Sequence, residues 1–238
     1  GSPMATDIEK APEALQTLVA DSDTGGRSAQ GIAAGMVFVI SIFWALFQLW
    51  QASPLPFALR WGVLNDTEAR SIHLGLALFL AYLAFPAWRS ANQRQQVPWF
   101  DWILAAAAAF AGSYLFAFYN ELATRPGQPS TLDIMTATAG MVLLLEATRR
   151  AVGWPMAVLA IVFVAYCLLG PWMPDVLAHK GASFNRMLSQ MWLGTEGVFG
   201  VALGVSSSAI FVYVLFGALL DRAGGGNYMM QVSFAALG

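Results

Sequence analysis

The sequence predicts an all-α, polytopic helical membrane protein with about six transmembrane helices and one amphipathic interfacial helix. Hydrophobic residues make up 58% of the chain and charged residues only 11%, whereas a soluble domain typically carries about 25% charged residues. Apolar stretches of about 20 residues, the length that crosses a bilayer, recur along the chain. Turn residues and short polar segments separate these stretches and mark the predicted loops.

Residues 1–28 precede the first apolar stretch and are polar or small. Gly1, Ser2 and Pro3 resemble what remains of an expression tag after cleavage, so they are left out of the fold prediction. The rest of the segment has no apolar core followed by a cleavage site, which excludes a signal peptide. We interpret residues 1–28 as a tag remnant and a mobile cytoplasmic tail, with a short helix around residues 8–20.

The first two predicted spans are residues 30–51 and 71–88, joined by a proline-containing loop. The first span ends in Trp44 and Trp50, aromatic residues that favour the membrane interface. His73 lies near the start of the second span, where a polar side chain reaches interfacial water. We therefore interpret His73 as a structural residue rather than a titrating one within the membrane.

The third and fourth predicted spans are residues 99–119 and 131–149. Asp101 lies in the first turn of the third span, where the helix dipole favours an acidic side chain. Glu146 and Arg150 stand four residues apart near the end of the fourth span. This spacing predicts an ion pair along one face of the helix, which we prefer to a contact between Glu146 and a substrate.

The fifth predicted span is residues 154–172, which begins with Trp-Pro and ends at Gly-Pro. Residues 175–196 contain the stretch FNRMLSQMWL, whose apolar and polar residues alternate as in a helix that lies along the membrane surface. The sixth span is residues 197–220. Residues 227–238 begin another apolar run that is too short to cross a bilayer.

Small and hydroxyl residues interrupt the sixth span, most densely at Ser206, Ser207 and Ser208. Such residues allow helices to approach closely and to hydrogen-bond across the contact, so helix packing is the preferred interpretation. The alternative is that these serines lie beside an ion or substrate path. Glu196, just before the span, faces either the same polar path or interfacial water.

The distribution of lysine and arginine predicts that the N-terminus is cytoplasmic. Of the 12 Lys and Arg residues, seven then fall on the cytoplasmic side and five on the outside. The positive-inside rule favours this orientation by a small margin.

Few known site types are compatible with the sequence. It contains no glycine-rich phosphate loop with Lys-Ser/Thr, no nucleophile elbow and no convincing acid–base pair. The two histidines, His73 and His179, lie in different segments, so their spacing indicates no metal site. We predict no catalytic residues, no metal-binding residues, no cofactor and no nucleic-acid partner, and we do not expect the chain to be an enzyme.

Three segments resemble one transporter family: RSIHLGLALFLAYLAFP (70–86), LLLEATRRAVGWPMAVLAIVFVAYCLLGPWMP (143–174) and SQMWLGTEGVFGVALGVSSSAIFVYVLFGALLDRAGGG (189–226). They are similar, in this order, to the fused membrane permease of tripartite ATP-independent periplasmic (TRAP) transporters of the TAXI-associated type. The resemblance implies a sodium-coupled secondary importer of organic acids in the bacterial inner membrane. Its implied partners are a periplasmic substrate-binding protein, the lipid bilayer and the remainder of a large transport domain.

The resemblance also implies a domain organisation. Residues 29–151 correspond to a small, scaffold-like domain of four helices, and residues 152–238 to the truncated start of the large transport domain. The family's sodium and substrate sites use a Ser/Gly-rich hairpin that lies beyond this correspondence. We therefore expect the full-length transporter to bind sodium and this chain alone to be inactive.

A second hypothesis is a structural or assembly membrane protein that binds another membrane subunit and transports nothing. It rests on the same helical architecture and differs only in the absence of transport. The residues assigned to an ion- or substrate-adjacent role under the first hypothesis would then pack helices instead. These residues are Glu196, Ser206, Ser207 and Ser208.

Overall fold

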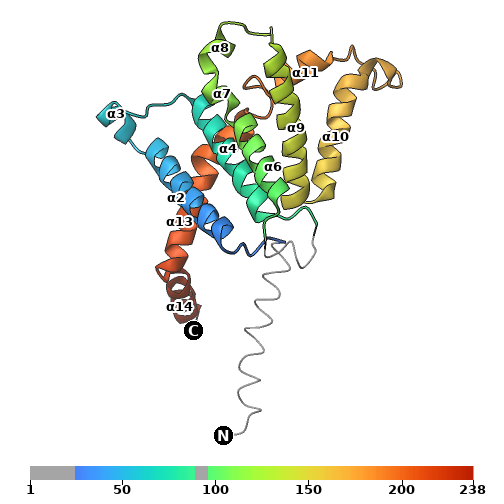
Figure 1. Ribbon diagram of the computed structural model, residues 1–238. Coiled ribbons are helices and arrows are strands. Elements are labelled where there is room, and N and C mark those ends of the chain that lie inside the picture. The colour runs from blue at the N-terminus through green and yellow to red at the C-terminus, as the bar shows by residue number, and fades with distance from the viewer. Residues whose placement is uncertain (1–24, 89–95, 238) are drawn as a thin grey trace.

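A computed structural model describes residues 25–88 and 96–237. Throughout these residues the ordered elements are helices, which confirms the predicted all-helical class (Figure 1). In chain order they are α2 (Ile32–Ala52), α3 (Leu55–Leu59), α4 (Asp66–Ala84), α6 (Trp99–Gly112), α7 (Tyr114–Ala117), α8 (Tyr119–Ala123), α9 (Thr131–Ala151), α10 (Trp154–Leu169), η1 (Gly170–Trp172), α11 (Phe184–Met191), α12 (Val201–Val205), η2 (Ser206–Ile210), α13 (Phe211–Arg222) and α14 (Gly225–Leu237). The helix expected around residues 8–20 lies outside the described residues.

Four stretches within the described residues are long and apolar enough to cross a membrane: Ile32–Ala52, Thr131–Ala151, Trp154–Trp172 and Val201–Arg222. They correspond to the first, fourth, fifth and sixth predicted spans. The other two predicted spans contain α4, which begins with charged residues, and α6, which has only 14 residues. The chain is therefore a helical membrane protein, and the count of six crossings stays a prediction.

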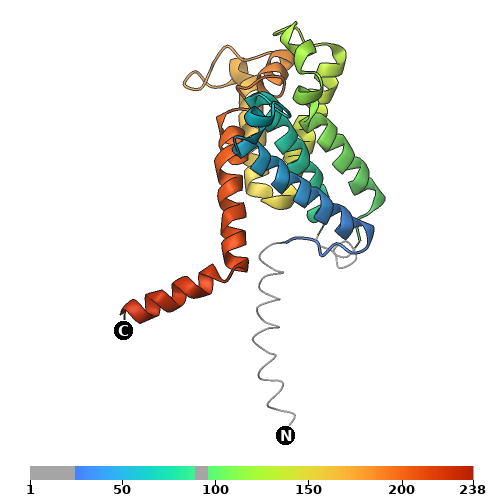
Figure 2. The ribbon, with the colours of Figure 1, turned by 90° about the vertical axis from the view of Figure 1, so that its left-hand side faces the viewer.

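α13 packs against α2 where it begins, and α14 then extends away from the bundle (Figures 1 and 2). The chain turns between them at Gly224, whose φ of 81° lies in the left-handed region that glycine adopts without steric cost. Large apolar side chains such as Tyr213, Phe216 and Phe234 are exposed along these helices. This surface faces lipid or another protein in a membrane.

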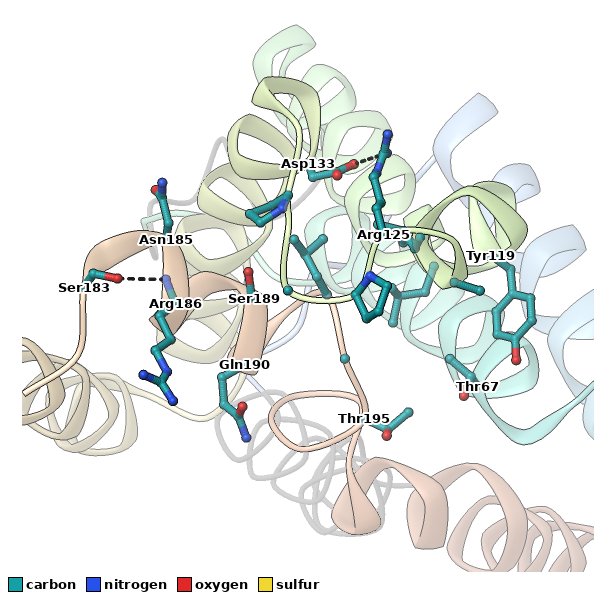
Figure 3. A pocket seen from close by; sticks show the side chains of 18 residues that line it. Thr67, Tyr119, Arg125, Asp133, Ser183, Asn185, Arg186, Ser189, Gln190 and Thr195 are labelled. Atoms are coloured by element: carbon teal, nitrogen blue, oxygen red, sulfur yellow. Dashed lines mark hydrogen bonds and ion pairs between the residues drawn. The ribbon is translucent and has the colours of Figure 1, made fainter.

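α9 begins at a capping box formed by Ser130 and Asp133, each of which accepts a hydrogen bond from the other's backbone N–H. The Asp133 carboxylate is buried and also accepts from the Tyr114 hydroxyl and from Arg125, whose Nη2 lies 3.1 Å away (Figure 3). One side chain therefore fixes the start of α9 and joins it to α7 and to the loop after α8.

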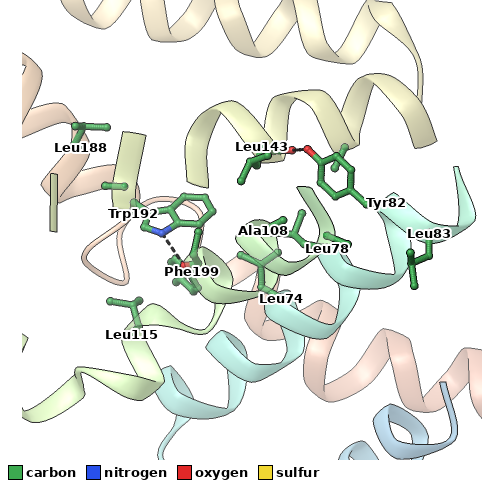
Figure 4. Packing of buried hydrophobic residues seen from close by; sticks show 14 of the residues in the cluster. Leu74, Leu78, Tyr82, Leu83, Ala108, Leu115, Leu143, Leu188, Trp192 and Phe199 are labelled. Atoms are coloured by element: carbon green, nitrogen blue, oxygen red, sulfur yellow. Dashed lines mark hydrogen bonds between the residues drawn. The ribbon is translucent and has the colours of Figure 1, made fainter. Parts of the chain in front are cut away.

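α4 lies at the centre of the buried core and packs against α6 and α9 (Figure 4). Its face carrying Leu74, Leu78 and Tyr82 is almost inaccessible to solvent. The Tyr82 hydroxyl donates a 2.7 Å hydrogen bond to the carbonyl oxygen of Leu143 on α9. A buried hydroxyl needs such a partner, so this bond lets an aromatic side chain fill the space between α4 and α9.

Glycines bring α4 and α6 into close contact. A Cβ atom added at Gly112 would lie 2.9 Å from the backbone of Gly75, closer than such atoms can approach. On the same side of α6, Ala105, Ala108 and Ala111 are buried. The two helices thus approach through small residues, the usual way for helices to pack within a membrane.

The third predicted span is not continuous, because α6 ends at Gly112 and α7 begins at Tyr114. Ser71 of α4 bridges this break: its hydroxyl donates to the Gly112 carbonyl oxygen at 2.7 Å and accepts from the Phe116 N–H at 3.1 Å. These bonds satisfy backbone groups that a continuous helix would satisfy internally. The predicted third span over residues 99–119 is thus built from α6, α7 and the start of α8 rather than from one continuous helix.

α11 is amphipathic as predicted, but its apolar face is not left free to lie on a membrane surface. Met187 and Leu188 are buried in the core between α11 and its neighbours α9 and α10. Two aromatic residues further along the chain, Trp192 and Phe199, also belong to the core and pack edge to face. The Trp192 indole N–H donates to the Ala111 carbonyl oxygen at 3.0 Å (Figure 4). Residues on both sides of the predicted domain boundary at 151/152 thus share one core.

At the opposite end of the bundle, buried charges join four segments of the chain. Asp101 at the start of α6 pairs with Arg27 at 2.6 Å and with Arg150 of α9 at 2.8 Å. Glu146 pairs with both Arg149 and Arg150, which confirms the predicted 146–150 pair.

The Arg27 side chain is fully buried and also donates to backbone oxygens at the end of α4. The last residues of the predicted mobile tail are thus anchored. We call Arg27, Asp101, Glu146, Arg149 and Arg150 the charge cluster.

Candidate functional site

The last candidate span is interrupted by a π-helical turn at the three serines. α12 ends at Val205, η2 covers Ser206–Ile210, and α13 continues from Phe211. Within this turn the Phe211 N–H bonds to the Ser206 carbonyl oxygen, five residues back instead of four. Single π-helical turns inside α-helices are frequent at functional sites. The π-helical turn therefore marks the first region in which to look for a site.

The serine hydroxyls are partly used within their own helix. Ser207 and Ser208 donate to the Gly204 carbonyl oxygen at 3.1 and 2.7 Å. Ser207 is buried, Ser206 is half-buried and Ser208 is exposed. Each hydroxyl still has lone pairs for another donor or a cation.

Arg70 of α4 lies directly against the interrupted span, a role that the sequence did not suggest. Its guanidinium donates to the carbonyl oxygens of Phe199 and Gly200 at 3.2 and 3.3 Å, and it also pairs with Asp66 at 3.5 Å. A Cβ atom added at Gly204 would lie 2.7 Å from the Arg70 Cζ atom. Gly204 is thus the small residue that admits the arginine.

A cleft of about 460 Å³ opens between α2, α4 and the π-helical turn. We call it the π-turn cleft. Its polar lining consists of Gln48, Gln51, Asp66, Arg70, Ser207 and Ser208. One positive and one negative side chain stand among amides and hydroxyls, a lining that suits a polar solute or a hydrated ion better than an apolar one.

His73 lies beneath this cleft, on the next turn of α4. Its Nδ1 atom lies 3.0 Å from the Trp44 indole nitrogen and 2.6 Å from the Gln48 side-chain nitrogen. An indole N–H only donates, so Nδ1 is an acceptor and the ring is the neutral tautomer protonated on Nε2. The expectation that His73 reaches interfacial water is wrong, because the residue is 3% exposed.

The aromatic contacts of His73 connect the cleft to α13. Phe211, the first residue of α13, packs against both Trp44 and His73, with ring centroids 4.7 and 5.8 Å apart. A movement of α13 relative to α2 and α4 would therefore change the surroundings of His73 and Gln48. The sequence signal for this group was Gln48, one of the few polar residues in a largely apolar helix.

The four residues predicted to lie near an ion or substrate are only partly brought together. Ser207 and Ser208 line the π-turn cleft, whereas Ser206 belongs to the same turn but not to the lining. Glu196 is exposed in the turn before α12 and does not line the cleft. Among the described residues no group of three His, Cys, Asp or Glu side chains has the arrangement of a metal site.

Comparisons with protein-family models, curated proteins and solved structures find no match to this chain. The resemblance of its three segments to a transporter family therefore stays a prediction. What the structure contributes is the π-turn cleft itself, with Asp66, Arg70, amides and hydroxyls beside a π-helical turn in a candidate membrane-spanning stretch.

Proposed function

We propose that this chain is a membrane permease component of a sodium-coupled secondary importer of organic acids, supplied by a periplasmic binding protein. The observation that carries the proposal is the interrupted span Val201–Arg222 with the polar π-turn cleft beside it. Secondary transporters bind their substrates and coupling ions where membrane helices depart from regular geometry and backbone oxygens become available, and a π-helical turn is a mild departure of this kind. The proposal places the protein in the bacterial inner membrane with a cytoplasmic N-terminus.

The contrast between a tightly packed bundle and exposed C-terminal helices supports this proposal. α4, α6 and α9 share a buried core with ion pairs at one end, as a rigid scaffold requires. By contrast, only 6% of the most apolar 18 residues within Val201–Arg222 are buried, against 33% of those within Thr131–Ala151 of α9. Under the proposal, residues 29–151 form the scaffold, and residues from 152 onward begin the part that carries substrate, with Met187, Leu188, Trp192 and Phe199 of that part packed into the scaffold core.

Sodium-driven uptake tests the proposed function. Cells that express the gene product containing this chain, together with its binding protein, would receive radiolabelled organic acids with and without an imposed sodium gradient. We expect accumulation that requires the gradient and that falls at least about tenfold in Arg70→Gln, because the neutral amide cannot hold the two carbonyl oxygens just before the interrupted span by charge-assisted bonds.

Arg60→Gln provides the matched control for this experiment. Arg60 is exposed after α3 and lies outside the lining of the π-turn cleft, so its loss should leave uptake unchanged. Both variants must reach the membrane at the wild-type level. Uptake that does not depend on the sodium gradient would contradict the proposed mechanism. Unchanged uptake in the Arg70→Gln variant would also contradict it.

A second candidate function, an assembly protein that binds another membrane subunit, is favoured by one specific observation. Tyr213 and Phe234 are 75% and 71% exposed on α13 and α14, and a partner subunit would cover such side chains. Crosslinking from these positions in native membranes tests it. A stable partner combined with no uptake of any organic acid would favour assembly over transport.

A further inference from the structure

A second hollow lies at the end of the bundle that carries α8 and α11, away from the charge cluster (Figures 1 and 3). Its volume is about 720 Å³, and we call it the α11 cavity. Its walls are the loop after α8, the first turn of α9, α11 and the turn at residues 193–195. Ligand sites for small molecules typically measure about 300–1,000 Å³, so the cavity has the size of a binding site.

The polar face of α11 forms one wall of this cavity. Ser183, Arg186 and Gln190 recur at intervals of three and four residues and line it together. Met187 and Leu188 lie on the buried side of the same helix. The amphipathic pattern of α11 therefore separates a protein core from a polar cavity, rather than lipid from water.

Arg125 supplies a buried donor on the opposite wall (Figure 3). Its Nη2 atom pairs with Asp133, but its Nε–H is buried and has no hydrogen-bond partner among the described residues. Buried donors are nearly always satisfied, because an unmade hydrogen bond in the interior costs free energy. This N–H is itself inaccessible, so a solute in the cavity would meet the exposed third of the Arg125 side chain (34%) rather than the Nε–H.

The charges around the cavity leave an excess of one positive charge. Arg125 and Arg186 are cationic, and Asp133 is the only acidic residue in the described lining. Arg186 is exposed and takes part in no ion pair among the described residues. Amide and hydroxyl side chains complete the polar lining: Asn185, Gln190, Ser189, Thr195 and Tyr119.

We propose that the α11 cavity is a binding site for a small hydroxylated carboxylate, distinct from the π-turn cleft. The excess positive charge attracts one carboxylate, and arginine binds carboxylate oxygens with paired N–H donors. The surrounding amides and hydroxyls suit the hydroxyl groups of such a solute. The choice of a carboxylate over another oxyanion rests on the proposed function, whereas the anion site itself rests on the geometry.

Equilibrium binding to the purified protein in detergent tests the site without any transport. The probe is radiolabelled gluconate, which carries one carboxylate and several hydroxyl groups. Sorbitol, with the same number of carbons and no carboxylate, and inorganic phosphate serve as competitors. We expect saturable gluconate binding that weakens at high ionic strength and that neither sorbitol nor an equal concentration of phosphate displaces.

Arg186→Gln is the decisive variant, because the exposed side chain holds no ion pair on which folding depends. We expect it to weaken gluconate binding about tenfold or more, as loss of a charge-assisted contact does. Arg60→Gln removes an equal charge from an exposed position outside the cavity and should bind gluconate normally. Arg125→Lys keeps the charge but replaces the planar guanidinium, with its paired N–H donors, by a single ammonium group, and should also weaken binding.

Three results would overturn the inference, and the first two are the absence of saturable gluconate binding and equal affinity in Arg186→Gln and the wild type. Displacement by phosphate at equal or lower concentration would also overturn it, since the site would then recognise phosphate groups such as those of lipids. The uptake experiment tests the proposed function separately from this binding site. Gluconate binding without any sodium-driven uptake refutes only the proposed function, and uptake without gluconate binding refutes only this site.

Discussion

Asp101 shows how one buried side chain can join distant parts of this chain. The carboxylate accepts from Arg27 through one oxygen and from Arg150 through the other, and both the acid and Arg27 are fully buried. The Arg150 guanidinium also stacks over the Tyr82 ring of α4, 4.7 Å from its centroid. The segment before α2, the start of α6 and the end of α9 are thereby held to α4.

Replacing this carboxylate by an amide should destabilise the protein strongly. Asp101→Asn leaves Arg27 and Arg150 buried without their shared counter-charge, and removing one partner of a buried ion pair costs about 3–5 kcal/mol. Thermal unfolding of the purified protein in detergent measures the loss. Asp175→Asn, at an exposed position, is the control and should unfold like the wild type. A wild-type midpoint for Asp101→Asn would show that the charge cluster contributes little stability.

At the residue scale, the sequence predicted local pairs better than distant ones. The Glu146–Arg150 pair follows from helical spacing, which is visible in any sequence. The Asp101–Arg27 pair joins residues 74 positions apart, and nothing in the local pattern links them. Arg70 was missed for the same reason, since its partners at Phe199 and Gly200 lie about 130 residues further along the chain.

At the scale of helices, the contact between α4 and α6 depends on glycine more than on large side chains. Gly112 and Gly75 face each other with backbone atoms in contact, so there is no room for even one methyl group. Because the obstruction is backbone, no side chain can rotate away to relieve it. The close approach also places Ser71 beside the end of α6, where it bridges the break before α7.

Gly112→Ala should therefore force α4 and α6 apart. Overpacking of a close-packed contact costs about 1–3 kcal/mol, which should appear as a lower midpoint of thermal unfolding in detergent. Gly35→Ala in α2 is the matched control, because a Cβ atom added there meets no atom within 4 Å. The control should be neutral or slightly stabilising, since alanine favours a helix over glycine. Equal midpoints for the two variants would contradict the proposed packing.

Helix positions were more predictable than helix interruptions. The stretches at 32–52, 131–151 and 154–172 follow directly from length and hydropathy. The break at Ser113 and the π-helical turn at Ser206 depend on bonds supplied by other helices or by shifted backbone partners. Likewise, the amphipathic pattern of α11 indicates two unlike surroundings, but only the fold shows that they are a core and a cavity.

At the scale of the whole molecule, the two ends of the bundle differ in chemistry. One end holds the charge cluster, in which three arginines face two acids in largely buried positions. The other end holds the α11 cavity, which is accessible and lined by amides and hydroxyls. The predicted orientation places the charge cluster at the cytoplasmic side and the α11 cavity at the periplasmic side, where a solute delivered from outside would arrive.

Cysteine labelling in whole cells tests this orientation and the number of crossings together. In a Cys167→Ala background, Gln96→Cys, Gln128→Cys and Ala223→Cys each place one thiol at an exposed position. A membrane-impermeant maleimide should label only position 128 in intact cells. All three positions should be labelled once the membrane is opened.

Position 96 decides between six crossings and four. If all six spans cross and the N-terminus is inside, α4 returns the chain to the inside and α6 takes it out again. Position 96 lies between these two helices, so it is inside and protected from the reagent. If only the four long apolar stretches cross, the chain stays outside from the end of α2 to the start of α9, and position 96 is labelled as readily as position 128. Labelling of 96 and 223 with protection of 128 would instead reverse the orientation, and it would turn the α11 cavity towards the cytoplasm.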